Sequence, residues 1–543
     1  MPKPLLPAKQ PAGMTTGEHS PALPLMRGYT ATYRCKRRVV FTHKKRSMPS
    51  APENGDDTLD ELLKDKARIV ELSSDDEDED EGPPFPGKGM VSSQHKQDLP
   101  LWMQSATLNL FHDELQTPSA EALAKTASEC LPYLMLEDTQ GLKVNSHGLQ
   151  QLRRKTHADF LHQFLGELPA PFAAMDASRP WLFYWCIAGL SFLDEDVGMY
   201  KDRLIETVRP LQNPSGGFGG GHGQYSHCAC TYATVLALTA VGGLEVVDRD
   251  ALWRWLGTVK QADGGFCMAV GAEEDIRGAY CAMTVITLLN LPLALPADAP
   301  ARKAGLTSFT DKVGDRVSRC QSYEGGIAGA PNNEVHGAYA FCALACLSIL
   351  DAPHISIPAY LDVHALAHWL ASMQTTPEGG FSGRPNKLVD ACYSHWVGAC
   401  FALIEAASPV PADTETAPLW NKEALVRYLM TCCQQPGKKG GLRDKPSTRP
   451  DGYHTCYSLS GLSAAQHHYT FDRRAATRDA GSGRLVAAFN WQGEKGSKEE
   501  MEKLKLDRGD VVELVHPVFV LRFEAVEAAR KQFGKAMGKQ QEE

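Results

Sequence analysis

A Gly-Gly pair followed by an apolar residue recurs five times between residues 216 and 442, and this repeat constrains the fold more than any other feature. A glutamine lies a few residues before each pair, and a tyrosine lies 14 to 17 residues after it. The pairs begin at Gly216, Gly264, Gly325, Gly379 and Gly440; the glutamines are Gln212, Gln261, Gln321, Gln374 and Gln434; the tyrosines are Tyr232, Tyr280, Tyr339, Tyr393 and Tyr457. A repeat of about fifty to sixty residues indicates a fold built from one recurring structural unit.

A helix of small and apolar residues follows each tyrosine, for example YAFCALACLSIL at residues 339–350. A helix that is apolar on all faces is buried, whereas the helices before each glutamine are amphipathic, as at residues 363–373. Each unit therefore predicts an outer amphipathic helix, a Gly-rich turn and an inner buried helix. Such units favour closure into an all-α ring over an open solenoid. In the ring, the N-termini of the inner helices gather at one end, which suits an anion.

Composition narrows the class of protein. The 543 residues carry a net charge of −9, which argues against a general nucleic-acid binder. Fifteen cysteines without a paired framework fit a reducing compartment. The N-terminus lacks the apolar core of a signal peptide, and no apolar run is long enough to span a bilayer. We therefore expect a cytoplasmic protein that is not inserted in a membrane.

The chain divides into segments of different character. Residues 1–90 read as a disordered extension, with a basic patch near 34–46 and an acidic run at 75–81. The basic patch is typical of a solvated tail, and a nuclear signal is the alternative. We expect a helical N-terminal segment over 91–147, a ring domain over 148–470 and 508–535, a charged insert loop over 471–507 and a C-terminal tail over 536–543. Residues 291–302 and 331–334 are expected to form surface loops without a role in the chemistry.

The stretch GGFSGRPNKLVDACYSHW carries the strongest chemical signal. Five of its side chains recur every third residue, and a cysteine stands among them; they are Arg384, Lys387, Asp390, Tyr393 and Trp396, with Cys392. Each three-residue step turns about 60° away from the last on a straight helix, so one helix cannot aim all five at one target. We expect a loop that carries Arg384 and Lys387, followed by a helix that begins near Asp390. Two cations suggest a phosphate ligand, and carboxylate plus thiol suggests zinc.

Another aromatic cluster lies upstream, in the motif DASRPWLFYW at 176–185. Trp181, Tyr184 and Trp185 share one helical face. The residues alone leave two readings open, which are core packing and the lining of an apolar ligand cavity.

Several long motifs occur in a shared order: DASRPWLFYW, GGFGGGHGQYSH, DIRGAYCA, HGAYAFCALA, GRPNKLVDACYSHW, DGYHTCYSLSGLS and a late LVHPVF. With these motifs the chain resembles the β-subunits of the protein farnesyltransferase family from about residue 148 to 465 and again near the C-terminus. The resemblance implies an α/α toroid with a central aromatic-lined funnel. It also implies an obligate α-subunit, zinc, and transfer of a prenyl group to the cysteine of C-terminal CaaX motifs.

Carried over onto matching positions, the resemblance also implies roles for individual residues. Zinc is expected at Asp390, Cys392 and His454, and magnesium at Asp444. The catalytic residues that contact diphosphate are expected to be His336, Arg384, Lys387 and Tyr393. The isoprenoid is expected against Trp181, Tyr232, Arg277, Tyr280, Gly337, Tyr339 and Trp396. The peptide is expected against Trp181, Trp185 and Tyr453.

The implied function is that of the catalytic β-subunit of a farnesyltransferase, which uses farnesyl diphosphate and CaaX-terminated proteins such as small GTPases. Trp181, backed by Tyr457, favours a fifteen-carbon chain, and a type I geranylgeranyltransferase β-subunit is the alternative. A ring-shaped scaffolding subunit should have lost the zinc and diphosphate positions, which are intact here. A terpene cyclase needs acidic DDxxD or DxDD motifs, and the repeat region has none. Pro385 and His395 depart from residues common in the family, which puts the polarity of the pocket rim in doubt.

Overall fold

The computed structural model describes residues 117–136, 141–408, 418–475 and 484–534, which all belong to one structural unit. The extension expected over 1–90, with its basic and acidic patches, and the tail over 536–543 lie outside the described residues. Within the described ranges, every helix is too short or too polar to cross a bilayer. The cysteines in these ranges are free thiols.

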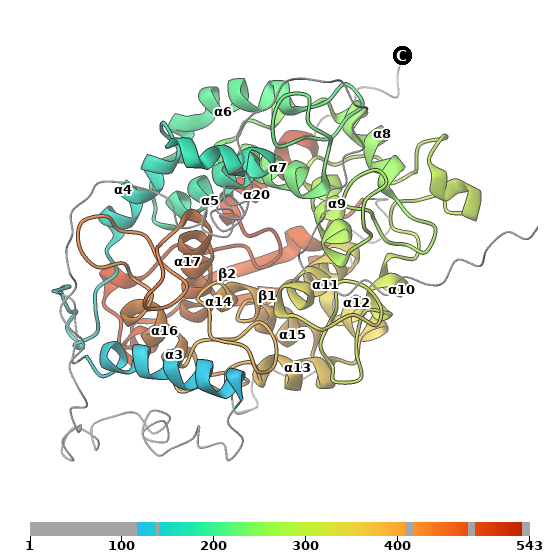
Figure 1. The fold of residues 1–543 in the computed structure, drawn as a ribbon. Coiled ribbons are helices and arrows are strands. Elements are labelled where there is room, and N and C mark those ends of the chain that lie inside the picture. The colour runs from blue at the N-terminus through green and yellow to red at the C-terminus, as the bar shows by residue number, and fades with distance from the viewer. Residues whose placement is uncertain (1–116, 137–140, 409–417, 476–483, 535–543) are drawn as a thin grey trace, which may run out of the picture. The chain divides into compact units, whose positions relative to one another are not determined.

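Inner helices stand side by side around a central axis and close into a ring (Figure 1). The last inner helix, α17, packs against the first, α5, which confirms the predicted all-α toroid. In order around the ring the inner helices are α5 (Arg179–Phe192), α7 (Cys228–Val241), α9 (Ile276–Leu288), α11 (Gly337–Leu350), the short α14 (Tyr393–Trp396) and α17 (Gly452–Gln466). The end of the ring where the Gly-Gly turns and the inner-helix N-termini lie is called the mouth below.

Further helices surround this ring. They are α3 (Pro118–Leu134), α4 (Arg154–Phe164), α6 (Lys201–Val208), α8 (Arg249–Val259), α10 (Val313–Ser318), α12 (Pro353–Tyr360), α13 (Val363–Ala371), α15 (Cys400–Ala407) and α16 (Lys422–Thr431). The 3-10 helices of the described chain are η1 (Ala170–Ser178), η2 (Val197–Tyr200), η3 (Arg209–Leu211), η4 (Leu244–Val246), η5 (Pro300–Ala304), η6 (Ala487–Asn490) and η7 (Arg508–Asp510). Helix α3 lies within the segment 91–147 that was expected to be helical, and it packs against α16.

Four of the five repeated glutamines join their unit to the outer helix of the next. Gln212 Nε2 donates to the carbonyl oxygen of Asp248 at 2.9 Å, and Gln212 Oε1 accepts from the backbone N–H of Asp248 at 2.9 Å. The same exchange joins Gln321 to Asp362 and Gln374 to Asn421. Gln434 accepts from the N–H of Arg153, which precedes α4, at 3.0 Å. The glutamine of the last unit therefore helps to close the ring onto α4.

At one boundary between two repeat units, a lysine makes this contact in place of the glutamine. Among the described residues, the side chain of Gln261 donates to the nearby carbonyl of Val259, at 3.0 Å, and not to the next unit. The preceding Lys260, 1% exposed, donates from Nζ to the carbonyl oxygens of Gly264 at 2.7 Å and Asp311 at 3.0 Å. Burial lowers the pKa of Lys260 to about 7. A buried lysine thus makes the contact between these two units, and the sequence pattern did not reveal it.

The first glycine of each pair lies at the same boundaries between repeat units, where a larger residue would clash. Gly216 has φ +94°, and a Cβ there would lie 1.9 Å from the carbonyl oxygen of Ala251 in the next outer helix. Gly264 has φ +105°, and its Cβ would lie 2.0 Å from the carbonyl oxygen of Lys312. Both positions combine a left-handed backbone with a close approach of the neighbouring unit, so only glycine fits.

The far end of the ring is closed by residues 515–521. Val518, Phe519, Val520 and Leu521 are at most 1% exposed. Two inner-helix tyrosines hold this segment, because Tyr184 donates to the carbonyl oxygen of Val520 at 3.0 Å and Tyr280 donates to that of Val518 at 2.7 Å. The terminal LVHPVF motif therefore forms a floor beneath the inner helices.

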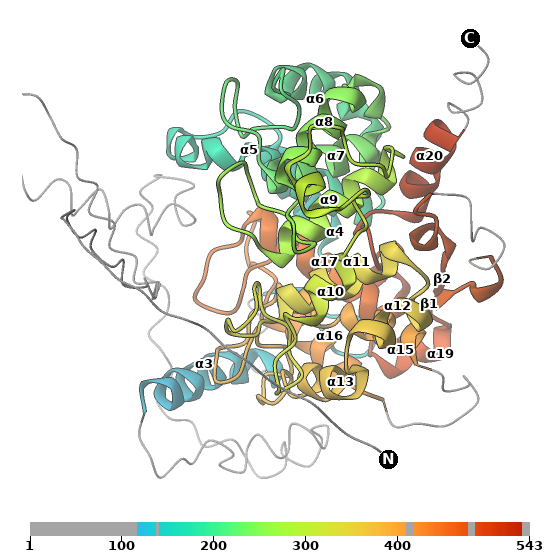
Figure 2. The ribbon, with the colours of Figure 1, turned by 90° about the vertical axis from the view of Figure 1, so that its right-hand side faces the viewer.

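The segment 471–507, expected to be a charged loop, has regular structure in its described part. Strand β2 (Trp491–Lys495) pairs antiparallel with β1 (His467–Phe471), and α19 (Lys498–Lys503) follows. Figure 2 places these elements beside α20 (Phe523–Gly534) on one side of the molecule. The charged composition hid the apolar anchors Trp491, Met501 and Leu504, which are 4%, 6% and 9% exposed. Residues 291–302 likewise bury Leu291 and Leu295, so they are not a simple surface loop.

Candidate metal and anion site

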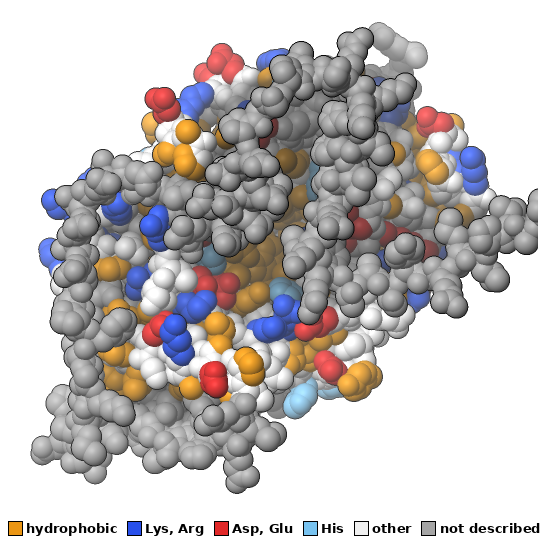
Figure 3. Space-filling view, in the orientation of Figure 1, with side chains coloured by type: hydrophobic (Ala, Val, Ile, Leu, Met, Phe, Trp, Pro, Cys, Tyr) orange, Lys and Arg blue, Asp and Glu red, His pale blue; other side chains and the backbone are white. Residues whose placement is uncertain are grey.

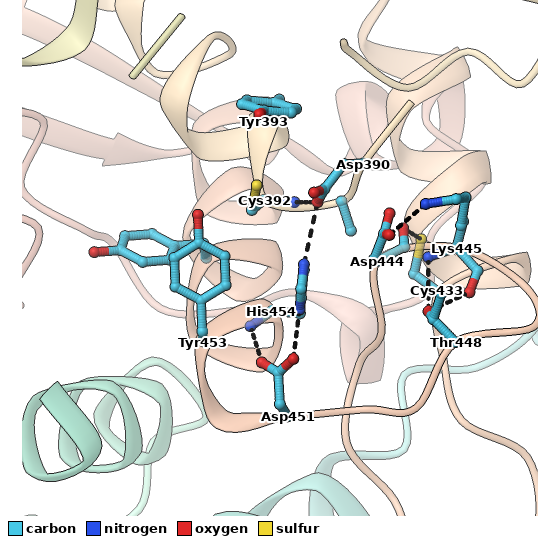
Figure 4. Close-up of polar contacts among 12 residues, drawn as sticks. Asp390, Cys392, Tyr393, Cys433, Asp444, Lys445, Thr448, Asp451, Tyr453 and His454 are labelled. Carbon is cyan, nitrogen blue, oxygen red and sulfur yellow. Dashed lines mark hydrogen bonds and ion pairs between the residues drawn. The ribbon is translucent and has the colours of Figure 1, made fainter. Parts of the chain in front are cut away.

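The three predicted zinc ligands lie together at the mouth. One ligand atom each from Asp390, Cys392 and His454 lies within 4.8 Å of the others. Asp390 and Cys392 belong to the turn before α14, and His454 belongs to the first turn of α17 (Figure 4). Asp390 Oδ1 accepts from the backbone N–H of Cys392 at 2.8 Å, which fixes the two ligands relative to each other.

Asp451 holds His454 in one orientation. Its Oδ1 caps α17 by accepting the N–H of His454 at 2.7 Å, and its Oδ2 lies 2.7 Å from Nδ1 of the same residue. The other ring nitrogen, Nε2, faces Asp390 Oδ1 at 3.3 Å, as Figure 4 shows. A carboxylate behind a histidine is the usual support of a metal-binding imidazole, because it fixes the tautomer.

Negative charge accumulates around this histidine. Burial would lower the pKa of His454, but hydrogen bonds and charge from Asp390 and Asp451 raise it to about 10. Asp444 adds a further carboxyl group, and burial together with the charge of Asp390 raises its pKa to about 6. The carboxylates that raise the pKa of His454 thus supply negative charge that a metal cation would balance.

The donor set fits zinc, and a neighbouring oxygen fits magnesium. Burial, followed by the charge of Asp390, raises the pKa of the Cys392 thiol, so this thiol needs a cation to ionise. One carboxylate, one thiol and one imidazole leave a fourth position open, as in catalytic zinc sites. Asp444 Oδ2 pairs with Lys445, while its buried Oδ1 has no hydrogen-bond partner among the described residues. A bare carboxylate oxygen is a ligand that Mg²⁺ prefers.

The predicted anion-binding residues face the same mouth. His336 precedes α11, and its Nδ1 accepts the N–H of Ala338 at 3.1 Å. Because Nδ1 is an acceptor, the neutral ring carries its proton on Nε2, which lies 3.2 Å from the hydroxyl of Tyr393. Burial lowers the pKa of His336 and keeps the ring neutral. Both side chains can thus present hydrogen-bond donors to an anion.

The two cations lie on the loop between the bridged residues Ser382 and Val389. Lys387 is exposed and has no ion pair within the described ranges, whereas Arg384 pairs with Glu334. Helix α14 begins at Tyr393, so the expected arrangement of a cationic loop followed by a helix is confirmed.

Arg277 and Gly337, both predicted to contact the isoprenoid, each form hydrogen bonds within the protein. Arg277 donates from Nε and Nη2 to the two carboxylate oxygens of Asp275 at 2.9 and 2.7 Å, and its guanidinium lies 5.7 Å from the ring centre of Tyr339. The N–H of Gly337, predicted to contact the isoprenoid, donates to the carbonyl of Gly383 at 2.8 Å. A Cβ at Gly337 would lie 2.5 Å from Val397, so close packing explains this glycine.

Aromatic rings form a closed belt around the inside of the ring. Each ring lies 4.5 to 5.8 Å from the next, centre to centre, and the belt contains most of the predicted isoprenoid and peptide contacts. Its members in order are Trp181, Trp185, Tyr453, Tyr457, Trp396, Phe341, Tyr280 and Tyr232. Figure 3 shows a central hollow with hydrophobic side chains inside and charged groups on its rim.

The belt corrects one detail of the expected funnel. Among the described rings, Trp181 packs against Trp185 and Tyr232, not against Tyr457. Tyr457 packs instead against His395 and Trp396, at 5.0 and 4.5 Å between ring centres. The two residues therefore act at different points of the wall.

Sequence reasoning missed three residues of this site. Phe341 lies five residues after the cap His336, as Tyr232 lies five after the cap His227, so counting from the helix caps would have found it. His227 caps α7 through Nδ1, as His336 caps α11, and it too directly precedes an inner helix. Asp451 stands three residues before His454, a common spacing for a capping carboxylate, and this signal was available.

Comparisons with known proteins agree with the fold. Residues 152–521 match the prenyltransferase alpha-alpha toroid domain. Protein farnesyltransferase subunit beta of Pyricularia oryzae is 49% identical over 421 residues, which cover 75% of this chain and 79% of that one. The Schizosaccharomyces pombe subunit of the same name is 38% identical over 352 residues, covering 64% of this chain and 84% of that one.

A solved structure supports the same architecture. The Candida albicans protein geranylgeranyltransferase-I complexed with GGPP superposes with a TM-score of 0.52 at 18% identity, covering 71% of this chain and 100% of that chain. At this identity the likeness concerns the fold alone. From the toroid domain match and the extended identity to the fungal subunits, we conclude that the chain belongs to the protein farnesyltransferase β-subunit family.

Proposed function

We propose that the chain is the catalytic β-subunit of a zinc-dependent protein farnesyltransferase, which transfers a farnesyl group from farnesyl diphosphate to the cysteine of C-terminal CaaX motifs. The observation that carries the proposal is a juxtaposition at one end of the ring. The cluster of Asp390, Cys392 and His454 lies beside the donors of Tyr393 and His336, above an aromatic belt. Metal ligands, anion donors and an apolar cavity are the three parts that this reaction needs.

Asp390, Cys392 and His454 would hold the zinc, which would supply a cation that keeps the peptide cysteine as a thiolate at neutral pH. Asp451 keeps Nε2 of His454 turned toward Asp390 and the metal position. Tyr453, whose hydroxyl accepts from Trp396 Nε1 at 3.0 Å, borders the same position from the aromatic belt. The chain thereby orients both the metal ligands and the wall against which the peptide would lie.

The chemical step joins sulfur to carbon and releases diphosphate. The thiolate sulfur attacks the first carbon of the farnesyl group, the carbon–oxygen bond breaks, and diphosphate leaves with the electron pair. Charge grows on the leaving oxygens, where His336, Tyr393, Arg384 and Lys387 can donate. Preorganised donors of this kind each lower a barrier by about 3 kcal/mol. Asp444 is proposed to hold magnesium, which would add charge beside the leaving group.

The isoprenoid is proposed to lie against the aromatic belt, with Trp181, Tyr232, Tyr280 and Trp396 in contact. Tyr339 and Arg277 would border the part of the chain nearest the mouth. Trp181, Trp185 and Tyr453 would contact the aliphatic residues of the peptide. Proteins with CaaX termini, such as small GTPases, are the proposed substrates, and a cytoplasmic location is proposed on composition alone.

An α-subunit is the proposed partner, because the relatives are subunits of a larger enzyme. The test measures transfer of labelled farnesyl to a CaaX peptide by the purified chain alone and by the chain assembled with an α-subunit. We expect turnover with the assembled pair and little or none with the single chain. Lack of transfer by an assembled, folded pair with zinc would refute the proposed function, and full turnover by the single chain would refute the obligate partner.

A further inference from the structure

The diphosphate position contains a carboxylate that none of the proposed steps uses. Glu334 ends the short hairpin that the bridge between Ala328 and Val335 closes, two residues before the cap His336. Its side chain, 63% exposed, pairs through Oε2 with Nη1 of Arg384, whose own side chain is 35% exposed. The loop 331–334, which was expected to have no role in the chemistry, thus places the carboxylate of Glu334 against Arg384, a residue proposed to bind diphosphate.

The ion pair between Glu334 and Arg384 differs from the one that Arg277 forms at the same end of the ring. Asp275, with 11% side-chain exposure, accepts two hydrogen bonds from the side chain of Arg277 and also caps the backbone of α9. Asp275 is therefore fixed by the fold, and Arg277 is fixed with it. Within the described ranges the hydrogen bond and ion pair of Glu334 go to Arg384, and its charge also favours protonation of the nearby His336. A ligand can therefore displace the carboxylate without breaking a contact that holds the backbone.

We propose that Glu334 is a displaceable counter-ion of Arg384: diphosphate replaces it on binding, and it recaptures Arg384 when diphosphate leaves. The inference rests on the proposed function, since it assigns diphosphate to this position. A diphosphate carries more charge than one carboxylate and can engage Arg384, Lys387 and Tyr393 together. It therefore displaces the carboxylate of Glu334 from Arg384. After the reaction, the carboxylate competes for the same guanidinium and repels the product.

This arrangement lowers affinity for diphosphate in return for faster release. Because the Glu334–Arg384 pair is partly exposed, its strength lies in the range of surface ion pairs. Removing the charge of Glu334 should therefore tighten diphosphate binding by about two- to fivefold. The gain should shrink as salt is raised, because exposed charges are screened within roughly 10 Å at 0.1 M salt.

The test measures binding of inorganic diphosphate, and separately of farnesyl diphosphate, to the assembled heterodimer by titration calorimetry at low salt. Glu334→Gln should bind inorganic diphosphate more tightly than wild type and release it more slowly. Glu324→Gln is the matched control, because Glu324 is an exposed glutamate of the preceding Gly-Gly turn. Arg384→Gln should weaken binding, and in that background Glu334→Gln should give no further gain.

Other results overturn the inference. Weaker binding by Glu334→Gln would mean that the carboxylate positions Arg384 for its ligand. An equal gain in the Arg384→Gln background, or in Glu324→Gln, would mean a general charge effect instead of an exchange at one guanidinium. If wild-type heterodimer binds neither diphosphate, the proposed function fails together with this inference. If it binds both and Glu334→Gln changes nothing, only this inference fails.

Discussion

Histidines at the two ends of the ring have opposite charge states. At the mouth, His454 lies between the carboxylates of Asp390 and Asp451, which outweigh burial and raise its pKa to about 10. Toward the closed end, His395 and His516 are buried among aromatic and apolar side chains, and burial lowers the pKa of each to about 3. The mouth is thus arranged to hold a cation, whereas the closed end excludes charge.

Tyrosine hydroxyls differ in the same way. At the mouth, the hydroxyl of Tyr393 contacts His336 and stays within reach of a ligand. At the closed end, Tyr184 and Tyr280 donate their protons to backbone carbonyls of the floor segment 515–521. The Tyr393 hydroxyl can therefore donate to an anion at the mouth. The hydroxyls of Tyr184 and Tyr280 already donate to the backbone at the closed end, where an apolar chain is expected.

The largest effect should come from removing an exposed lysine at the mouth that has no ion pair among the described residues. Lys387→Ala should lower turnover of CaaX peptide about hundredfold or more, because one preorganised donor to the leaving diphosphate is lost. Steady-state transfer with the assembled heterodimer measures this. Lys303→Ala, which removes another exposed lysine outside the mouth, is the control and should leave turnover unchanged. Equal turnover in both variants would remove Lys387 from the site.

A smaller effect is expected where the belt limits the length of the isoprenoid. Trp181→Thr should make room beside Tyr232, and a geranylgeranyl chain brings five more carbons worth up to about 4 kcal/mol if they are buried. We expect the product ratio to shift about tenfold or more toward geranylgeranyl transfer. Competition between the two diphosphates for one CaaX peptide measures the ratio. An unchanged ratio would show that selectivity lies elsewhere in the belt.

The smallest effect concerns stability at the closed end. His395 stays neutral in the folded protein, whereas an unfolded histidine takes up a proton below a pKa of about 6.5. The folded-state pKa is the lower one, so His395 costs stability as pH falls below 6.5, by about 1.4 kcal/mol for each pH unit. His395→Phe should therefore gain stability relative to wild type as pH falls.

Urea midpoints between pH 7 and 5 would measure this difference, and Ser460→Ala is the matched control. Ser460 Oγ lies 2.9 Å from Nδ1 of His395, so its removal takes away that hydrogen bond but leaves the titrating ring. A difference between His395→Phe and wild type that does not change with pH would contradict the account of a neutral, buried histidine.

The sequence was sufficient to predict the ring because the signals of the ring are local. All-apolar helices such as α11 and the Gly-Gly turns follow from residue type and spacing, and the cross-unit glutamines recur visibly. The role of those glutamines could not be predicted, since their partners lie in the next unit. Lys260 was missed for the same reason, because its acceptor on Asp311 is 51 positions away.

Only part of the candidate site could be predicted from the sequence. The repeat and the motif resemblance led to the metal ligands, to Tyr393 and to the aromatic residues, which the fold brings together. Glu334 was dismissed as part of a surface loop, because its partner Arg384 lies 50 positions away. Charge composition also concealed β2, whose anchor Trp491 is isolated among polar residues.

The most direct test of the account is the zinc content of purified heterodimer, measured by mass spectrometry after dialysis, together with its affinity for farnesyl diphosphate. Cys392→Ala should lose most of its zinc and its peptide turnover, while affinity for farnesyl diphosphate changes little, because the anion donors are separate side chains. Cys346→Ala, which alters a buried thiol of α11 away from the mouth, should keep its zinc. Full zinc occupancy in Cys392→Ala would contradict the assignment of the metal site.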